Sequence, residues 1–441
     1  MDRERGKHIP GFGTQKRAPR KVMRNIAVLS SDQDLNDRIQ KIVAPFDEDF
    51  NAIFLGDRES FVQYLNYELP EIDIINYRAE VDETLEIIKH DPWLHFGGSI
   101  VIFDHENEEE LLKRLGGVNI VALIQKARLE SYLPKVLQVL RENRSILFQR
   151  DIHALLQSNL SGTFEIENDP FEASVYSNLI ANFLFNSNLI GLERKENFYA
   201  ALMELIINAI EHGNCRVTYE EKKAYLRENS DAMRLINEKN QDPEIQNKRV
   251  HVSYRITPRK SSVKIRDEGE GFDWRAYENE YEVDVDQLHG RGIMMARHYL
   301  SRLTYNDRGN EVSFEIDHID EVNVVPRVFT NMEEVSFEDG QVVFQQGEKS
   351  SHLYYIISGE FNIIANGRAI STLTPADIFL GEMSFLLNNR RSATVVTVGR
   401  GVCIRISKEA FINAIKEQPH YGIFLARLLA QRLDQIHEIT L

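Results

Sequence analysis

The spacing of short apolar runs changes twice along this chain, and each pattern constrains the fold that its segment can adopt. Residues 25–125 contain short β-branched runs, such as NIAVLSS, IDIINY and GSIVIFDH, that alternate with polar segments of helical character. Residues 151–318 contain longer amphipathic helical patterns, and residues 335–406 contain closely spaced strand patterns with glycine-bearing turns. One hydrophobic core rarely organises more than about 300 residues. A chain of 441 residues with three patterns is therefore expected to be multidomain, with α/β and α+β parts.

The composition is that of an ordinary globular protein, with 42% hydrophobic and 27% charged residues. The formal charge of -16 repels a phosphate backbone, so we expect no nucleic-acid partner. No apolar run approaches the roughly 20 residues that span a bilayer, and the N-terminus lacks the apolar region of a secretory signal. We therefore expect a cytoplasmic protein without a membrane partner. Cys215 and Cys403 predict neither a disulfide framework nor a zinc site.

The N-terminal part divides into a predicted disordered tail, residues 1–22, and a predicted doubly wound parallel sheet, residues 23–148. The order of strands and helices resembles that of a response-regulator receiver domain. Where a receiver carries its phosphorylatable aspartate, at the end of the third strand, this chain has Asn76, and Ser31 and Asp32 replace the acidic pair after the first strand. Because an amide is a poor nucleophile, we predict a pseudo-receiver that captures no phosphoryl group.

Three motifs occur in order within residues 151–320: ELIINAIEHGN at 204–214, IRDEGEGFD at 265–273 and LHGRGIMMAR at 288–297. Their order and spacing resemble the N, G1 and G2 boxes of the GHKL ATPase superfamily. The resemblance implies an α/β sandwich with the Bergerat fold, which binds ATP with Mg²⁺. The charged, helix-prone segment 219–247 has no strong apolar face, so we predict an exposed helical insertion there.

The residue types in these motifs suit a nucleotide. Glu204 and Asn208 are four residues apart, so on a helix they share a face and can address one Mg²⁺-triphosphate. The family resemblance implies that Asn208 is the metal ligand. Asp267 follows a predicted strand and can accept a hydrogen bond from the adenine amino group. Glycines allow the backbone to approach the base and the phosphates; those predicted to do so are Gly269, Gly271, Gly290 and Gly292. The alternative is that these residues only serve a helix surface and turns.

Within the superfamily, the segment before the first motif distinguishes two branches. It leaves no room for the helical hairpin that carries the phospho-acceptor histidine of sensor kinases. A strand followed by FEASVYSNLIANFLFNSNLIG resembles the anti-sigma-factor serine/threonine kinases instead. This resemblance implies that Glu204 is the general base for a protein serine and that residues 273–287 form a lid over the nucleotide.

The last region, residues 327–441, predicts a β jelly roll with C-terminal helices. Its segment FLGEMSFLLNNRRSATVV, at 379–396, resembles the phosphate-binding cassette of cyclic-nucleotide-binding domains. The resemblance implies a binding set of Gly381, Glu382, Arg391, Ser392 and Ala393.

The chemistry of the cassette agrees with this resemblance. A cyclic phosphate needs a planar cation, which Arg391 provides, and the adjacent ribose 2′-OH needs an acceptor, which Glu382 provides. Ala376-Asp377 replaces the usual Gly-Asp before the cassette, and Arg390 replaces a proline that often precedes the arginine. The alternative is a degenerate domain that keeps the barrel without the ligand. Either cAMP or cGMP fits the sequence.

Together the motifs predict a cyclic-nucleotide-regulated serine/threonine kinase of the anti-sigma type, which acts on a protein partner such as an anti-sigma antagonist or a sigma factor. The rival hypothesis is a non-catalytic regulator that sequesters its partner in an ATP-dependent manner. The apolar side of residues 423–436 fits either a homodimer contact or packing within its own domain.

Overall fold

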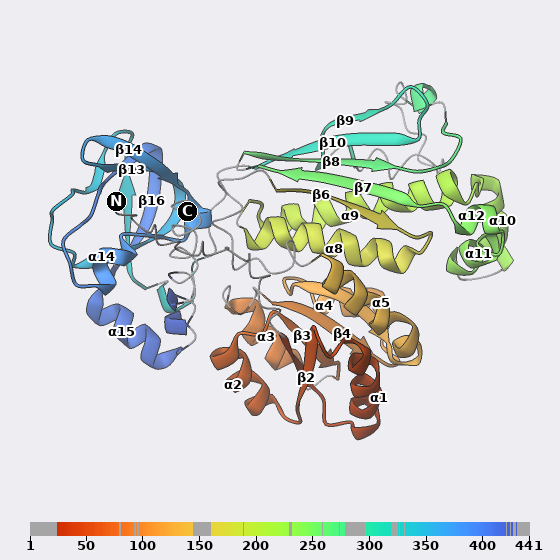
Figure 1. Ribbon diagram of the computed structural model, residues 1–441, viewed down its shortest axis with the longest axis horizontal. Helices are drawn as coiled ribbons and strands as arrows, with labels where there is room; N and C mark the ends of the chain where they lie inside the picture. Colours follow the sequence, from red (N-terminus) through yellow and green to blue (C-terminus); the bar gives the residue numbers. More distant parts are fainter. Residues whose placement is uncertain are drawn as a thin grey trace, which may run out of the picture.

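The computed structural model describes residues 24–143, 160–277 and 296–429, apart from short gaps within these ranges. It contains three sheets, one in each predicted region (Figure 1). The predicted tail, most of the predicted lid, and Gly290 and Gly292 lie outside the described residues. Among the described residues, no helix is both long enough and apolar enough to cross a membrane.

The N-terminal sheet is parallel throughout, with the strand order β2-β1-β3-β4-β5. This is a common order of doubly wound folds. Its receiver-like identity stays a prediction. Its elements are β1 (Arg24–Leu29), α1 (Gln33–Val43), η1 (Ala44–Phe46), β2 (Phe50–Leu55), α2 (Arg58–Glu68), β3 (Ile72–Asn76), α3 (Asp82–His90), β4 (Gly98–Phe103), α4 (Glu108–Arg114), β5 (Ile120–Gln125), η3 (Lys126–Arg128) and α5 (Leu129–Glu142).

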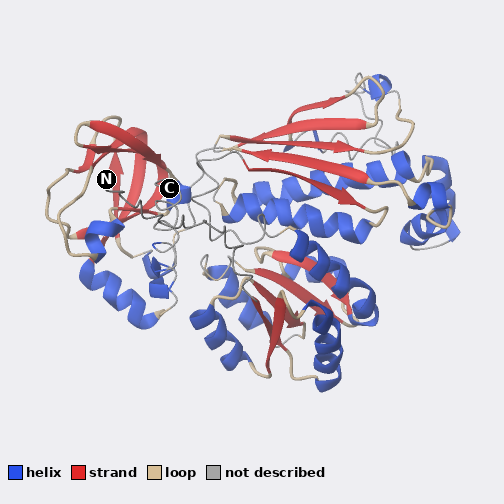
Figure 2. Ribbon diagram, in the orientation of Figure 1, coloured by secondary structure: helices blue, strands red, loops and turns tan. Residues whose placement is uncertain are grey.

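Both faces of this sheet are buried, as Figure 2 shows by the helices on either side of the strands. Ile26 and Val28 point to the face that α1 and α5 cover, whereas Ala27 and Leu29 point to the face that α2 and α3 cover. A strand buried on both sides needs a continuous apolar run, which explains the sequence of β1.

The middle domain is an antiparallel sheet of order β6-β7-β8-β10-β9, with α8 and α9 on one face. Its strands alternate buried and more exposed residues because only that face is covered. Its elements are β6 (Leu160–Ile166), α8 (Pro170–Asn186), α9 (Leu192–Asn208), the π-helix η5 (Ala209–Asn214), α10 (Tyr219–Glu228), α11 (Ala232–Lys239), α12 (Pro243–Gln246), β7 (Val250–Ile256), β8 (Lys260–Arg266), η6 (Trp274–Tyr277), β9 (Ser301–Tyr305) and β10 (Glu311–Asp317).

Helix α8 joins the first two domains. It packs between the antiparallel sheet and the edge strand β5, and residues of both domains belong to one hydrophobic core. Asn182 Nδ2 donates to the backbone carbonyl of Ile120 at 2.9 Å, and Asn178 Nδ2 donates to that of Val121 at 3.3 Å. These amides cap carbonyl groups of an edge strand that would otherwise lack partners. The N-terminal domain is therefore firmly docked on the middle domain.

The predicted insertion is helical but not wholly exposed. Leu235, Ile236 and Ile245 are buried in the same core, so α11 and α12 pack onto the domain. The charge of the segment hid these few apolar residues, and the prediction of an exposed insertion was wrong for them.

The C-terminal domain is a β-sandwich in which β13 and β16 form the longest pair. Helix α14 follows β15, and helix α15 follows β16. Cys403 of this domain and Cys215 of the middle domain are both buried, free cysteines. Its elements are η7 (Arg327–Phe329), β11 (Glu333–Phe337), β12 (Val342–Phe344), β13 (His352–Ala365), β14 (Arg368–Leu373), η8 (Pro375–Asp377), β15 (Phe379–Leu380), α14 (Glu382–Leu386), β16 (Thr394–Ser407) and α15 (Lys408–Glu417).

Candidate nucleotide sites

The carboxylate and amide of the first motif lie on the last turns of α9. Asn208 Nδ2 donates to Glu204 Oε1 at 3.3 Å, so the two side chains share one face of the helix as predicted from their spacing. The amide oxygen of Asn208 is not used in this bond, and amide and carboxylate oxygens are ligands that Mg²⁺ accepts. Glu211, further along, is buried and paired with Lys222 at 2.5 Å. Glu211 therefore has a structural partner that the sequence did not reveal.

Asp267 lies in a cradle of glycines directly after β8. A Cβ atom on Gly213 would lie 2.4 Å from Asp267 Cγ, and one on Gly269 would lie 2.3 Å from the carbonyl oxygen of Gly213. The backbone N–H of Gly269 donates to Asp267 Oδ1 at 2.8 Å. No side chain larger than hydrogen fits at either glycine without a shift of the backbone or of Asp267. The π-helix η5 brings Gly213 to this position.

Burial dominates the electrostatics of Asp267, whose exposed fraction is 9%. Desolvation raises the pKa of this carboxyl to about 6, although the N–H of Gly269 acts in the opposite direction. Asn310 fixes the backbone around it, because Asn310 Nδ2 donates to the carbonyl of Asp267 at 3.2 Å and the Asp267 N–H donates to the carbonyl of Asn310 at 3.1 Å. Asn310 was not predicted from the sequence.

An aromatic group flanks the same region. The ring of Tyr305 lies 5.3 Å from that of Phe272, edge to face, and 6.1 Å from that of Trp274, stacked. Burial raises the pKa of Tyr305 to about 12, with smaller contributions from the charges of nearby residues that include Asp267 and Glu204. The predicted adenine-binding carboxylate and the predicted base therefore lie within electrostatic reach of one tyrosine.

Gly271 has a positive φ of +83°, and a Cβ atom there would lie 1.9 Å from the carbonyl oxygen of Arg308. Only glycine fits this turn. The described residues contain no cluster of three or more His, Cys, Asp or Glu side chains that could hold a metal ion by itself.

In the C-terminal domain, Gly381 begins α14 with a left-handed backbone, φ +76°. Glu382, the first helical residue, is 6% exposed, and Ala393 is also buried, whereas Ser392 is exposed. The predicted binding residues thus gather around the short helix α14 and the start of β16.

The Arg391 guanidinium is buried and already engaged by the protein. Its Nη1 donates to the carbonyl of Gly381 at 2.9 Å and to Ser384 Oγ at 3.0 Å, and its Nη2 donates to the carbonyl of His352 at 2.5 Å. Its Cζ lies 4.0 Å from the ring centroid of Phe344, and burial lowers its pKa. A guanidinium has five N–H donors, so these bonds leave two for an anion. The sequence predicted the charge here but none of its protein partners.

At the carboxyl edge of the N-terminal sheet, Asp32 Oδ2 accepts from Lys126 Nζ at 2.7 Å, and this bond lowers the pKa of Asp32. Asn76 ends β3, as predicted, and its Nδ2 lies 3.4 Å from Ser30 Oγ. The absence of phosphoryl capture stays a prediction.

Models of two known protein families match the middle and the C-terminal domains of this chain. A model of the histidine kinase-like ATPase domain matches residues 172–316. A model of the cyclic nucleotide-binding domain matches residues 334–418.

Individual relatives share only part of their length with this chain. A cAMP-dependent protein kinase regulatory subunit of Dictyostelium discoideum is 29% identical over 129 residues, which is 27% of this chain and 38% of the relative. A cGMP-dependent protein kinase of Plasmodium berghei is 33% identical over 81 residues, which is 18% of this chain and 9% of the relative. The structure of the Thermus thermophilus catabolite activator protein aligns with 26% identity and a TM-score of 0.24, covering 26% of this chain and 55% of that one. The chain thus spans well under two thirds of each of these proteins. What it carries is a histidine kinase-like ATPase domain followed by a cyclic nucleotide-binding domain.

Proposed function

We propose that this protein is a cytoplasmic, cyclic-nucleotide-regulated kinase that transfers the γ-phosphoryl group of ATP to a serine or threonine of a protein partner. The observation that carries the proposal is the glycine cradle around the buried carboxylate of Asp267, in which Gly213 comes from the π-helix that directly follows the Glu204–Asn208 pair.

In this proposal Asp267 accepts a hydrogen bond from the adenine amino group, and Gly269 and Gly271 allow the backbone to turn beside the base. Asn208 holds Mg²⁺ through its amide oxygen, and the ion, when bound, offsets charge on the phosphates. Gly290 and Gly292 bring backbone N–H groups to the phosphates. Glu204 accepts the proton of the attacking hydroxyl as the γ-phosphoryl group moves to it and ADP leaves.

The C-terminal domain supplies the input. Arg391 pairs with the cyclic phosphate, Glu382 accepts from the ribose 2′-OH, and backbone groups at Gly381, Ser392 and Ala393 complete the site. We propose cAMP as the first ligand to test, with cGMP as the alternative. The names of the relatives include both ligands.

The proposed partner depends on the resemblance to the anti-sigma-factor serine/threonine kinases. We propose an anti-sigma antagonist or a sigma factor, and a homodimer through residues 423–436 is a second contact to test. The alternative function is a non-catalytic regulator that binds its partner only when ATP is bound.

Replacing Glu204 with Gln separates these functions, because the amide keeps the shape of the side chain but accepts no proton. For a kinase, transfer of labelled γ-phosphate to the purified partner should fall by about 100-fold or more, with ATP affinity nearly unchanged. The matched control is Glu193→Gln, an exposed residue in the first turn of the same helix. Unchanged transfer in Glu204→Gln would reject the catalytic role, and partner binding that needs ATP without any transfer would favour the alternative.

A further inference from the structure

Two buried asparagines connect the adenine-site carboxylate to the start of α8, at the same end of the antiparallel sheet. Asn214 ends the π-helix and is fully buried; its Oδ1 accepts from the backbone N–H of Glu268 at 2.8 Å. Its Nδ2 donates to Asn168 Oδ1 at 2.9 Å. Gly213, the preceding residue, packs directly against Asp267. The amide of Asn214 therefore fixes both the peptide that follows Asp267 and the glycine that touches it.

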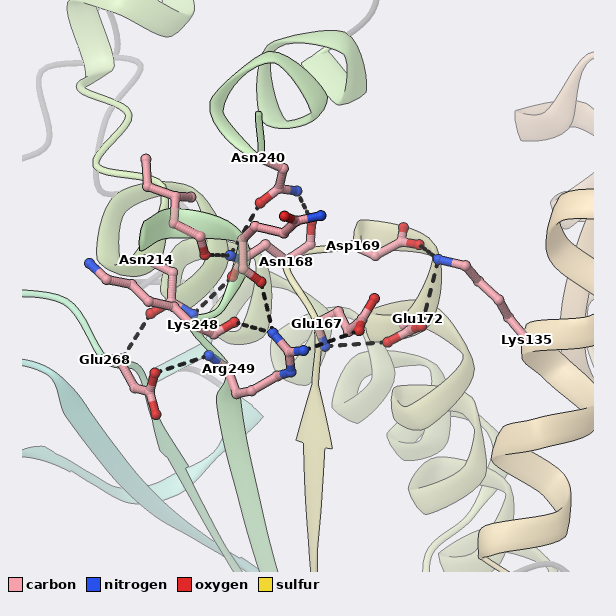
Figure 3. Close-up of polar contacts among 12 residues, drawn as sticks. Lys135, Glu167, Asn168, Asp169, Glu172, Asn214, Asn240, Lys248, Arg249 and Glu268 are labelled. Carbon is pink, nitrogen blue, oxygen red and sulfur yellow. Dashed lines mark hydrogen bonds and ion pairs between the residues drawn. The ribbon is translucent and has the colours of Figure 1, made fainter. Parts of the chain in front are cut away.

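Asn168, between β6 and α8, uses both its amide nitrogen and its amide oxygen in hydrogen bonds (Figure 3). Its Nδ2 donates to the carbonyl of Ile245 at 2.8 Å and lies 3.3 Å from Asn240 Oδ1. Asn240 Nδ2 donates in return to the backbone carbonyl of Asn168 at 2.9 Å. Because a buried amide without partners is costly, these bonds allow one orientation of the Asn168 side chain.

The next residue is held from the N-terminal domain. Asp169 caps α8, with Oδ1 accepting from the N–H of Phe171 at 2.9 Å, and its Oδ2 accepts from Lys135 Nζ of α5 at 2.6 Å. Lys135 also lies 3.7 Å from Glu172, and Figure 3 shows it reaching both carboxylates. Although burial opposes its charge, the hydrogen bond from Lys135 to Asp169 and the nearby acidic charges raise its pKa. Charge-assisted bonds of this kind are the stronger ones.

We propose that Asn168 and Asn214 are positioning residues for Asp267, and that Lys135 of the N-terminal domain holds them in place. Recognition of the adenine amino group then depends on the docking of the N-terminal domain. The inference rests on the proposed function, because it takes Asp267 as the acceptor for that amino group.

A positioning role differs measurably from a merely structural one. Inosine triphosphate has the size and phosphates of ATP but carries an oxygen in place of the amino group. Loosening of the whole domain would weaken the binding of both nucleotides by a similar factor. Misplacement of Asp267 would weaken the binding of ATP more than that of inosine triphosphate, because only ATP carries the 6-amino donor for which Asp267 is the proposed acceptor.

The experiment is calorimetric titration of ATP and of inosine triphosphate into the full chain and its variants. We expect the wild type to prefer ATP by about tenfold or more, as for a hydrogen bond to a charged group. Asn214→Ala and Asn168→Ala should lose most of that preference through weaker ATP binding. Lys135→Met should move it in the same direction, and the exposed Asn237→Ala should leave it unchanged.

An Asn168→Ala and a Lys135→Met protein that both keep the wild-type preference would overturn the inference, whatever their absolute affinities. These two variants decide the matter if Asn214→Ala does not fold, which circular dichroism would report. A wild type that binds both nucleotides equally would reject adenine recognition by Asp267 itself, and the inference with it. The two failures are therefore distinguishable.

Discussion

At the scale of single residues, burial disfavours the charged form of Asp267, the carboxylate proposed to bind adenine. Asp267 is nearly buried, and its ordinary hydrogen-bonding partners are backbone groups rather than cations. Desolvation therefore outweighs hydrogen bonding and raises its pKa to about 6. For an acid, this sign means that the folded state holds the proton more tightly than the unfolded chain. The group stabilises the fold least once the pH exceeds about 6, and binding can recover that cost.

The pH dependence of ATP binding should follow this carboxyl. Only the ionised form is a strong acceptor for the amino group, so ATP affinity should fall by about tenfold between pH 7 and pH 5. Inosine triphosphate carries the same titrating phosphates without the amino group, and its affinity should fall less. Calorimetry across this range measures both. Parallel profiles for the two nucleotides would show that Asp267 does not set the pH dependence.

The sequence indicates candidate residues for the chemistry but not the groups that hold them in place. Glu204, Asp267 and Arg391 stand out because their types and spacing suit a nucleotide. Gly213 and Asn310 contact Asp267 from segments more than 40 residues away in the chain, and no local pattern encodes such contacts. Ser384 and the carbonyl groups around Arg391 were also missed, although two of these three partners lie within ten residues of it in the chain.

At the scale of elements, periodicity located most strands and helices but not how completely they are covered. Helix α8 was predicted as amphipathic, and the structure buries it nearly all round because two domains pack against it. Helix α9 is α-helical only to Asn208, and the chain then widens into the π-helix η5. This widening places Gly213 against Asp267, and it depends on tertiary contacts that helix propensity does not describe.

The turn into α14 offers a test with an internal control. Gly381 and Gly367 share φ +76°, but a Cβ atom on Gly381 would lie 2.2 Å from Arg391 Nη1, whereas Gly367 faces open space. Alanine at either position should cost about 1–2 kcal/mol of stability through its backbone conformation. Gly381→Ala should also displace Arg391 and weaken cAMP binding by about tenfold or more.

Thermal unfolding and calorimetric titration of the two full-length variants with cAMP make this comparison. Equal cAMP affinity in Gly367→Ala and Gly381→Ala would mean that the position of Arg391 does not determine binding.

At the scale of the whole molecule, the N-terminal domain contributes to both hydrophobic clusters that join domains in the described part of the chain. One cluster contains its sheet together with α8 and α9. The other contains Leu69 and partly buried Leu94 together with Phe329 and Tyr421 of the C-terminal part. A cavity of about 830 Å³ lies at this second contact, which is thus less closely packed than a domain core. These contacts favour a route between the two nucleotide domains through the N-terminal domain.

Tyr421→Phe should weaken that route while keeping the ring that stacks on Phe329. The hydroxyl of Tyr421 donates to Asp91 Oδ2 at 3.1 Å, and a bond to a charged group is worth about as much as a typical coupling energy. We expect cAMP binding to persist and its effect on ATP affinity to shrink. The exposed Tyr67→Phe, on α2 of the N-terminal domain, is the control. An effect of cAMP as large as in the wild type would exclude this contact from the route.

Regulation of the ATP-binding domain by the cyclic-nucleotide domain is measured by titration of ATP into the full chain with and without saturating cAMP. Coupling between two sites typically amounts to about 1–3 kcal/mol, so we predict that cAMP changes ATP affinity at least about fivefold, and that ATP changes cAMP affinity by the same factor. Identical ATP affinities in a protein that binds both ligands would contradict the account.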